Sequence, residues 1–123
     1  MADWTEKHVR KNVYTELDQW VNNWLLNTIR KQPNPTLLWC ADWWKHPEAV
    51  SRLAGLWAAW ENSHQLAGNE PSNWWIHHYQ TQWPELTSTT GPFKSCTPQK
   101  HEPDPNKLPT TKPKYVNNTT KPN

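Results

Sequence analysis

Glycine, phenylalanine, methionine and long apolar runs are scarce in this chain of 123 residues, which has three glycines, one phenylalanine and one methionine. Because no apolar run approaches 18 residues, we expect no helix that spans a membrane. Residues 1–12 are charged and polar and lack the apolar segment of a secretory signal peptide, so we expect a cytoplasmic protein. The chain also lacks a P-loop, a G-x-G-x-x-G fingerprint and an H-E-x-x-H motif, so none of these enzyme signatures is present.

Tryptophan is the residue present in excess, with eleven copies in a chain whose hydrophobic fraction is only 34 %. Each indole can bury on the order of 200 Å², so a small core rich in tryptophan is feasible with few aliphatic residues. The length allows one domain. We therefore look for a single compact body in which aromatic rings replace much of the usual aliphatic packing.

Apolar periodicity predicts an all-α domain of about three helices. The first apolar repeat runs from Val9 to Ile29 and ends at Arg30-Lys31. The second helix is predicted over residues 47–65, with Pro47 at its first position, where a missing N–H costs nothing. Gly55 inside it predicts close approach of another backbone or an indole. The third helix is predicted from residue 71 to a point before Pro84, because proline disfavours a continuing helix.

Composition divides the chain into a lead-in, a domain and a tail. Residues 1–12 are expected to be flexible or helical, and residues 13–96 to form the helical, Trp-rich domain. Residues 97–123 hold six of the twelve prolines and five lysines against two acidic residues, a net charge of +3. Such a composition cannot bury enough apolar surface to offset ordering entropy, so we expect a disordered tail.

Residues 17–96 contain a series of motifs: Trp39-Cys40, Trp43-Trp44, His46-Pro47-Glu48-Ala49-Val50, Arg52-Leu53, Leu56-Trp57, Ala59-Trp60-Glu61, Trp74-Trp75, His78, Gly91-Pro92-Phe93 and Cys96, with an upstream run from Trp20 to Leu26. These motifs resemble a family of domains of unknown function from high-GC Gram-positive bacteria and their phages and plasmids. The chain differs from that pattern at Ile76-His77 and over residues 79–83, where members commonly carry charges. The resemblance implies a similar fold but no established activity, and it leaves the tail outside the match.

Two thiols and two imidazoles form the sharpest candidate site, since together they make a complete tetrahedral zinc set. All four fall in the resembled motifs, and the ion would join the second helix, the third helix and the final loop. His77 is an alternative to His78, because adjacent helical residues point about 100° apart. Free thiols beside structural histidines, or a disulfide, are the other interpretations, and His101 is expected to be free in the tail. The four candidate ligands are Cys40, His46, His78 and Cys96.

A partner surface is the second candidate site. So small a body cannot bury every tryptophan, and an exposed aromatic patch is typical of a protein interface. A basic side chain stacked on such rings would add a cation–π contact. The candidate residues are Trp43, Trp44, Trp74, Trp75 and Arg52.

These sites favour a non-enzymatic, zinc-stabilised accessory or adaptor protein that binds a protein partner through its aromatic surface. The resemblance adds the expectation of a phage or plasmid role. The alternative is a nucleic-acid-binding accessory factor that uses exposed tryptophans and the basic tail. A small metalloenzyme is less favoured, because four protein ligands leave no open position on the metal. If one of these ligands were absent, Glu48 or Glu61 would serve as general base.

Overall fold

Three helical stretches make up the fold, and the structure, a computed structural model, describes residues 13–65 and 68–115. Within these ranges there is no β-strand. Two isolated turn bridges occur, Asn34 with Leu37 and Thr97 with Lys100. The predicted all-α fold of about three helices is therefore confirmed. None of the described helices has both the length and the apolar character needed to cross a membrane.

The first stretch consists of α2 (Leu17–Trp20), the π-helical turn η1 (Val21–Leu25) and α3 (Leu26–Ile29). Trp20, Val21 and Leu25 are fully buried, as the apolar repeat predicts. Arg30 ends the stretch in the left-handed conformation, with φ of 44°. The helix thus stops where the sequence predicts, and the part of the predicted repeat before residue 13 lies outside the described residues.

The longest helix is α4 (Pro47–His64), with 18 residues, and elements of the other two stretches pack against it. It begins at Pro47, as predicted, and its inward side carries Leu53 and Leu56, both fully buried. The expectation at Gly55 is wrong, because a Cβ built there would have nothing within 4 Å. This glycine faces open space and serves no close contact.

The third stretch continues farther than the sequence predicts. It consists of α5 (Glu70–Trp74), the π-helical turn η3 (Trp75–Tyr79) and α6 (Gln80–Thr87), and Pro84 lies inside α6. The predicted end before Pro84 is therefore wrong. Trp83 and Leu86 are buried on either side of this proline. Their packing outweighs the missing backbone hydrogen bond, a case of tertiary contacts overriding local propensity.

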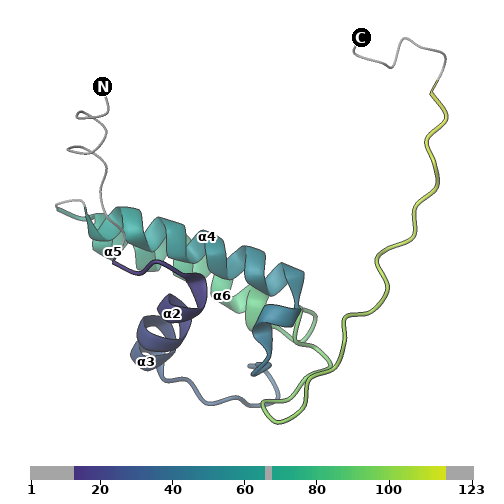
Figure 1. Cartoon of the computed structure of the whole chain (residues 1–123), viewed down its shortest axis with the longest axis horizontal. Coiled ribbons are helices and arrows are strands. Elements are labelled where there is room, and N and C mark those ends of the chain that lie inside the picture. Colours follow the sequence, from purple (N-terminus) through teal and green to yellow (C-terminus); the bar gives the residue numbers. More distant parts are fainter. Residues whose placement is uncertain (1–12, 66–67, 116–123) are drawn as a thin grey trace.

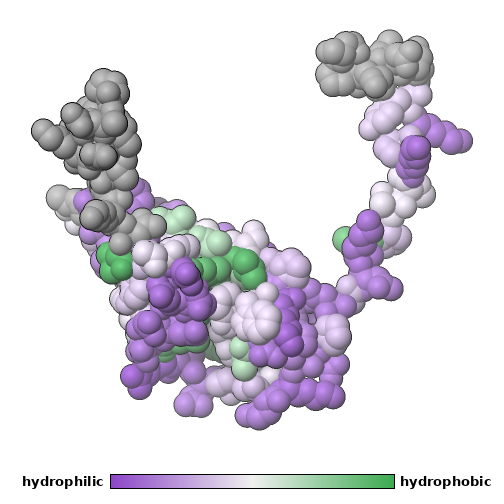
Figure 2. Space-filling model, viewed as in Figure 1, coloured by the Kyte–Doolittle hydropathy of each residue, from purple (hydrophilic) through white to green (hydrophobic). Residues whose placement is uncertain are grey.

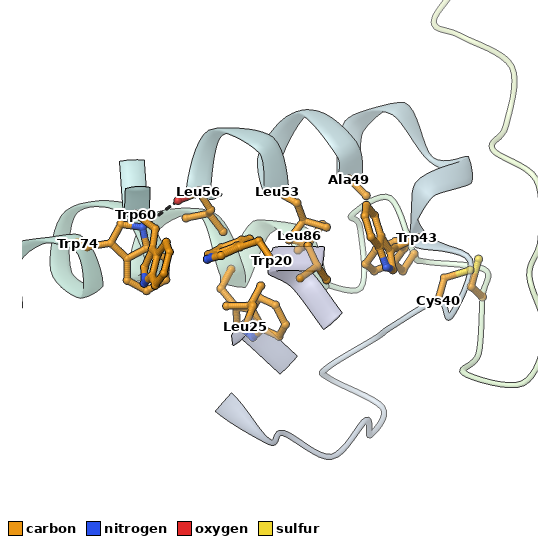
Figure 3. Packing of buried hydrophobic residues seen from close by; sticks show 14 residues of the cluster. Trp20, Leu25, Cys40, Trp43, Ala49, Leu53, Leu56, Trp60, Trp74 and Leu86 are labelled. Carbon is orange, nitrogen blue, oxygen red and sulfur yellow. Dashed lines mark hydrogen bonds between the residues drawn. The ribbon is translucent and has the colours of Figure 1, made fainter. Parts of the chain in front are cut away.

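The core is rich in tryptophan and follows α4 (Figure 3). In Figure 3, Trp60 and Trp74 lie at one end of the packed row and Cys40 lies at the other. The Trp74 indole N–H donates to the Leu56 carbonyl at 2.9 Å, which fixes the third stretch against α4. Trp20 and Trp60 are buried, while Trp24 and Trp57 are partly buried against the same core.

Aromatic rings link the core to the end of the molecule where the loops meet. Neighbouring rings in this row have centroids 4.8 to 5.8 Å apart. Pairs of Phe, Tyr and Trp rings stabilise beyond their buried area, by about 0.5–1.5 kcal/mol each. They supply contacts that the few aliphatic side chains cannot. In order, the row contains Trp74, Tyr79, Trp83, Trp39, Phe93, His46 and His101.

Beyond Cys96 the chain makes one further turn against the body and then extends away from it (Figure 1). Thr97 and Lys100 pair through both backbone N–H groups, at 3.0 and 3.1 Å. Residues 105–115 contain neither helix nor strand and are exposed, and Figure 2 shows this segment mainly in hydrophilic colours. His101, Glu102 and Asp104 contact Cys40, Cys96 and His46. Residues 101–104 therefore contact the domain, although the predicted domain boundary lies before them.

Candidate metal centre

Four side chains from four separate segments converge at the loop end of the molecule. Cys40 precedes the 3-10 turn η2 (Trp43–Lys45), and His46 follows that turn directly before α4. Cys96 ends the loop after α6, and His101 follows the turn of residues 97–100. One ligand atom from each of these four residues lies within 4.8 Å of all the others. Together they can hold a metal ion.

Backbone contacts between the loops bring these residues together. The Leu38 N–H donates to the Thr87 carbonyl at 2.9 Å, which joins the Cys40 loop to the end of α6. Gly91 starts the turn that leads to Cys96, and a Cβ at this position would lie 2.5 Å from the Glu85 carbonyl oxygen. Only glycine therefore fits this close approach, and the loop can fold back far enough to place Cys96 beside His46.

The distances within the cluster fit a tetrahedral metal. The Cys96 Sγ lies 3.4 Å from the His46 Nε2, and the Cys40 Sγ lies 3.3 Å from the His101 Nδ1. A zinc ion with bonds of about 2.3 Å to sulfur and about 2.0–2.1 Å to nitrogen separates such ligand atoms by about 3.5 Å. These two pairs therefore have nearly the separation that an ion requires, and the four ligand atoms, which lie within 4.8 Å of one another, would move closer together around it.

The surroundings of the two sulfurs bear on their charge. Burial raises the pKa of the Cys40 thiol to about 11; a backbone hydrogen bond from Asp42 opposes this rise, and the neighbouring Cys96 adds to it. Without a metal Cys40 is thus a neutral thiol near pH 7, and a binding ion must displace its proton. Cys96 accepts a hydrogen bond from the Glu102 backbone N–H at 3.3 Å, a contact that suits a metal-bound thiolate.

One carboxylate lies directly behind the cluster. The Asp104 Oδ1 is 2.6 Å from the His46 Nδ1, on the side of the ring opposite Cys96. The His46 side chain is only 1 % exposed, whereas Asp104 is 38 % exposed. The sequence offered no signal for Asp104, because this contact joins positions 58 residues apart.

Three of the four predicted ligands meet in this cluster: Cys40, His46 and Cys96. The structure does not bring His78 to it. His78 is exposed in η3 and lines a separate cavity of about 510 Å³ together with His77. The fourth position belongs to His101, so the prediction of a free His101 is wrong. The spacing Cys96-x4-His101, close to Cys40-x5-His46, was the signal that could have found it.

The predicted aromatic surface divides between core and exterior. Trp43 and Trp74 are buried, at 5 % and 1 % exposure, and Trp75 is partly buried. Trp44 is 59 % exposed, and the Lys45 Nζ lies 5.3 Å from its ring centroid. Arg52 does not stack on a ring in any described contact; it pairs with Glu48 at 3.0 Å and donates to Gln82 at 2.7 Å. Trp44 thus remains the one predicted partner tryptophan that is largely exposed.

Comparison with known proteins assigns the chain to a family. Residues 14–114 match the domain of unknown function DUF4913. The chain belongs to this family. The DUF4913 match extends beyond residue 96 and includes His101 and Asp104, so the expectation that the tail lies outside the match is wrong. No curated protein and no solved structure matches the chain.

Proposed function

We propose that this DUF4913 protein is a non-enzymatic binding protein whose fold is stapled by one zinc ion. The observation that supports this proposal is the convergence of two thiols and two imidazoles within 4.8 Å. Thiolates and imidazoles in a tetrahedral arrangement favour zinc over harder cations such as magnesium and calcium. The four ligands are Cys40, His46, Cys96 and His101.

The staple is structural, because four protein ligands leave no coordination position for a substrate. Cys96, His46 and Asp104 also have the relative order of a nucleophile, a base and an orienting carboxylate. Cys96 is only 5 % exposed, however, and its sulfur faces His46 beside Cys40 and His101 rather than solvent. This crowding supports coordination over nucleophilic attack.

Trp44 provides the binding surface in this proposal. It lies in η2, between the ligands Cys40 and His46, so an ion held by both fixes the turn that presents it. Beside it is a cavity of about 400 Å³, which is lined by Asp18, Asn22, Ala41, Trp43 and Trp44. An exposed tryptophan at the edge of a cavity is typical of an energetic hot spot in a protein interface. A protein partner is therefore the occupant that this surface supports; a phage or plasmid role rests on the motif resemblance.

Elemental analysis tests the zinc staple. Protein purified without chelator should contain one zinc per chain, and Cys40→Ser and His101→Ala should lose most of it. His78→Ala is the matched control, because His78 is an exposed histidine outside the cluster and should retain full zinc. Zinc below about a tenth of an equivalent in the unsubstituted chain would rule out the staple, as would equal loss from His78→Ala.

A second substitution pair tests the surface. Photo-crosslinking from a probe amino acid at Ala41, in the native host, should trap a defined protein partner, and Trp44→Ala should abolish the product. Ile76→Ala is the control, because Ile76 is an apolar side chain of similar exposure, 50 %, in η3. Equal crosslinking by Trp44→Ala and Ile76→Ala would rule out Trp44 as the site.

Nucleic-acid binding is the second candidate, and the extended segment supports it. Lys107, Lys112 and Lys114 are exposed there, and no acidic residue occurs in residues 105–115. Fluorescence anisotropy with a labelled oligonucleotide at two salt concentrations tests this function. Binding to phosphates through these lysines should weaken steeply with salt and should disappear when residues 105–123 are deleted. No binding at low salt would exclude it.

A further inference from the structure

His46 is the most constrained ligand of the cluster, and both of its ring nitrogens face a partner. The Nε2 lies 3.4 Å from the Cys96 Sγ, and the Nδ1 lies 2.6 Å from the Asp104 Oδ1. Phe93 and His101 pack against the ring, with centroids 5.3 and 4.8 Å away. With 1 % exposure the imidazole cannot exchange these partners for water without moving the loops around it.

The carboxylate decides which nitrogen carries the proton. An ionised carboxylate only accepts hydrogen bonds, so the short contact requires the His46 Nδ1 to be the donor. In a neutral imidazole the other nitrogen then has a free lone pair. That nitrogen is Nε2, and its lone pair faces Cys96 and the centre of the cluster.

We propose that Asp104 is the positioning residue of the zinc site: its carboxylate holds His46 with Nδ1 protonated and with Nε2 directed at the ion. This inference rests on the proposed zinc staple and adds to it a residue outside the ligand set. A carboxylate behind a metal-bound histidine fixes the orientation of the ring and increases its basicity as a ligand. Loss of such a partner commonly weakens metal binding by about 10–100-fold.

The neighbouring acidic residue has a different role, although it lies only two positions away. The Glu102 carboxylate is 2.9 Å from the Lys100 Nζ, and only the backbone of Glu102 contacts Cys96. Glu102→Gln therefore removes the same charge near the cluster but retains the N–H that donates to the sulfur. It is a matched control for Asp104→Asn, since both variants preserve side-chain size.

Competition with a chromophoric zinc chelator measures the effect on affinity. The dissociation constant of Asp104→Asn should rise about 10–100-fold relative to the unsubstituted chain. That of Glu102→Gln should change by less than about fivefold, as expected for an exposed ion pair. Circular dichroism of the metal-free variants should show unchanged helix content, which separates loss of ligand positioning from loss of fold.

Nitrogen-15 NMR of the His46 ring supplies a readout that a purely structural role for Asp104 would not produce. The unsubstituted chain should show the Nδ1–H tautomer without metal, and coordination through Nε2 with zinc. The opposite tautomer, or equal zinc affinity in Asp104→Asn and Glu102→Gln, would overturn this inference while leaving the staple intact. Failure of the unsubstituted chain to bind zinc would instead overturn the proposed function, and the role of Asp104 in metal binding with it.

Discussion

Two acidic side chains, Glu61 and Asp104, hold together parts of the chain that are far apart in sequence. The Glu61 carboxylate accepts hydrogen bonds from the backbone N–H groups of Val13 and Tyr14, at 2.6 and 2.8 Å, and from the Trp57 indole at 3.0 Å. Glu61 is only 4 % exposed. A buried carboxylate with three donors is stabilising, whereas the same group without them would be costly.

Glu61→Gln tests how much this residue stabilises the fold. The substitution replaces one acceptor oxygen with an NH₂ group, which would face a backbone N–H donor. We expect the free energy of unfolding to fall by about 1–3 kcal/mol, measured by urea denaturation. Glu48→Gln is the control in the same helix, because its carboxylate is 51 % exposed and pairs only with Arg52 among the described contacts. It should cost about 0.3–0.5 kcal/mol, and equal losses in the two variants would contradict this role for Glu61.

At the scale of elements, local signals predicted the helices and failed where packing overrides them. Pro47 and the repeat of Leu53 and Leu56 lie within α4 itself, and the predicted helix over residues 47–65 differs from the observed one by a single residue at its end. Pro84 is also a local signal, yet α6 passes through it because Trp83 and Leu86 are held in the core. Pro84 can be read from the sequence, but the packing of Trp83 and Leu86 in the core cannot.

Replacing each of two glycines with alanine should change the free energy of unfolding in opposite directions. Gly55 is in the middle of α4 with nothing within 4 Å of an added Cβ, so Gly55→Ala should raise the free energy of unfolding by about 1 kcal/mol. Gly91 follows α6, and a Cβ there would lie 2.5 Å from the Glu85 carbonyl oxygen. Gly91→Ala should therefore destabilise the fold, by about 1–3 kcal/mol from overpacking. Urea denaturation of both variants checks the pair, and a change of the same sign in both would contradict this interpretation.

The candidate site could also be predicted only in part, because contacts between distant segments complete it. Residue chemistry pointed to Cys40, His46 and Cys96, because the chain has only two cysteines and His46 stands directly before a predicted helix start. His101 completes the cluster in place of His78 because the chain after Cys96 folds back, and that geometry depends on contacts between distant segments. The Pro- and Lys-rich composition after residue 96 predicted disorder, and so concealed the ligand at His101.

At the scale of the whole molecule, the row of aromatic rings from Trp74 to His101 joins the packed tryptophans to the candidate metal ligands. His46 and His101 are the last two members of this row. An ion bound to both would therefore also hold in place the ring contacts of Phe93 with His46 and with Trp39. All four candidate ligands lie outside the helices, in the loops and turns at one end of the fold. We therefore expect zinc to contribute most to stability where regular secondary structure contributes least.

Two truncations test whether the segment after Cys96 completes this end of the fold. A chain ending at residue 104 keeps His101 and Asp104, so it should bind zinc as the full chain does. A chain ending at residue 96 lacks both and should bind weakly or not at all.

A ligand present at 100 times its dissociation constant stabilises the folded state by about 2.7 kcal/mol, which corresponds to roughly 10–20 °C in Tm for a domain of this size. Chelator should therefore lower the Tm of the full chain and of the 104-residue chain by that amount, and should leave the 96-residue chain unchanged. Equal Tm values for the three chains with zinc present would mean that the domain is complete at Cys96, against the convergence of ligands that the structure describes.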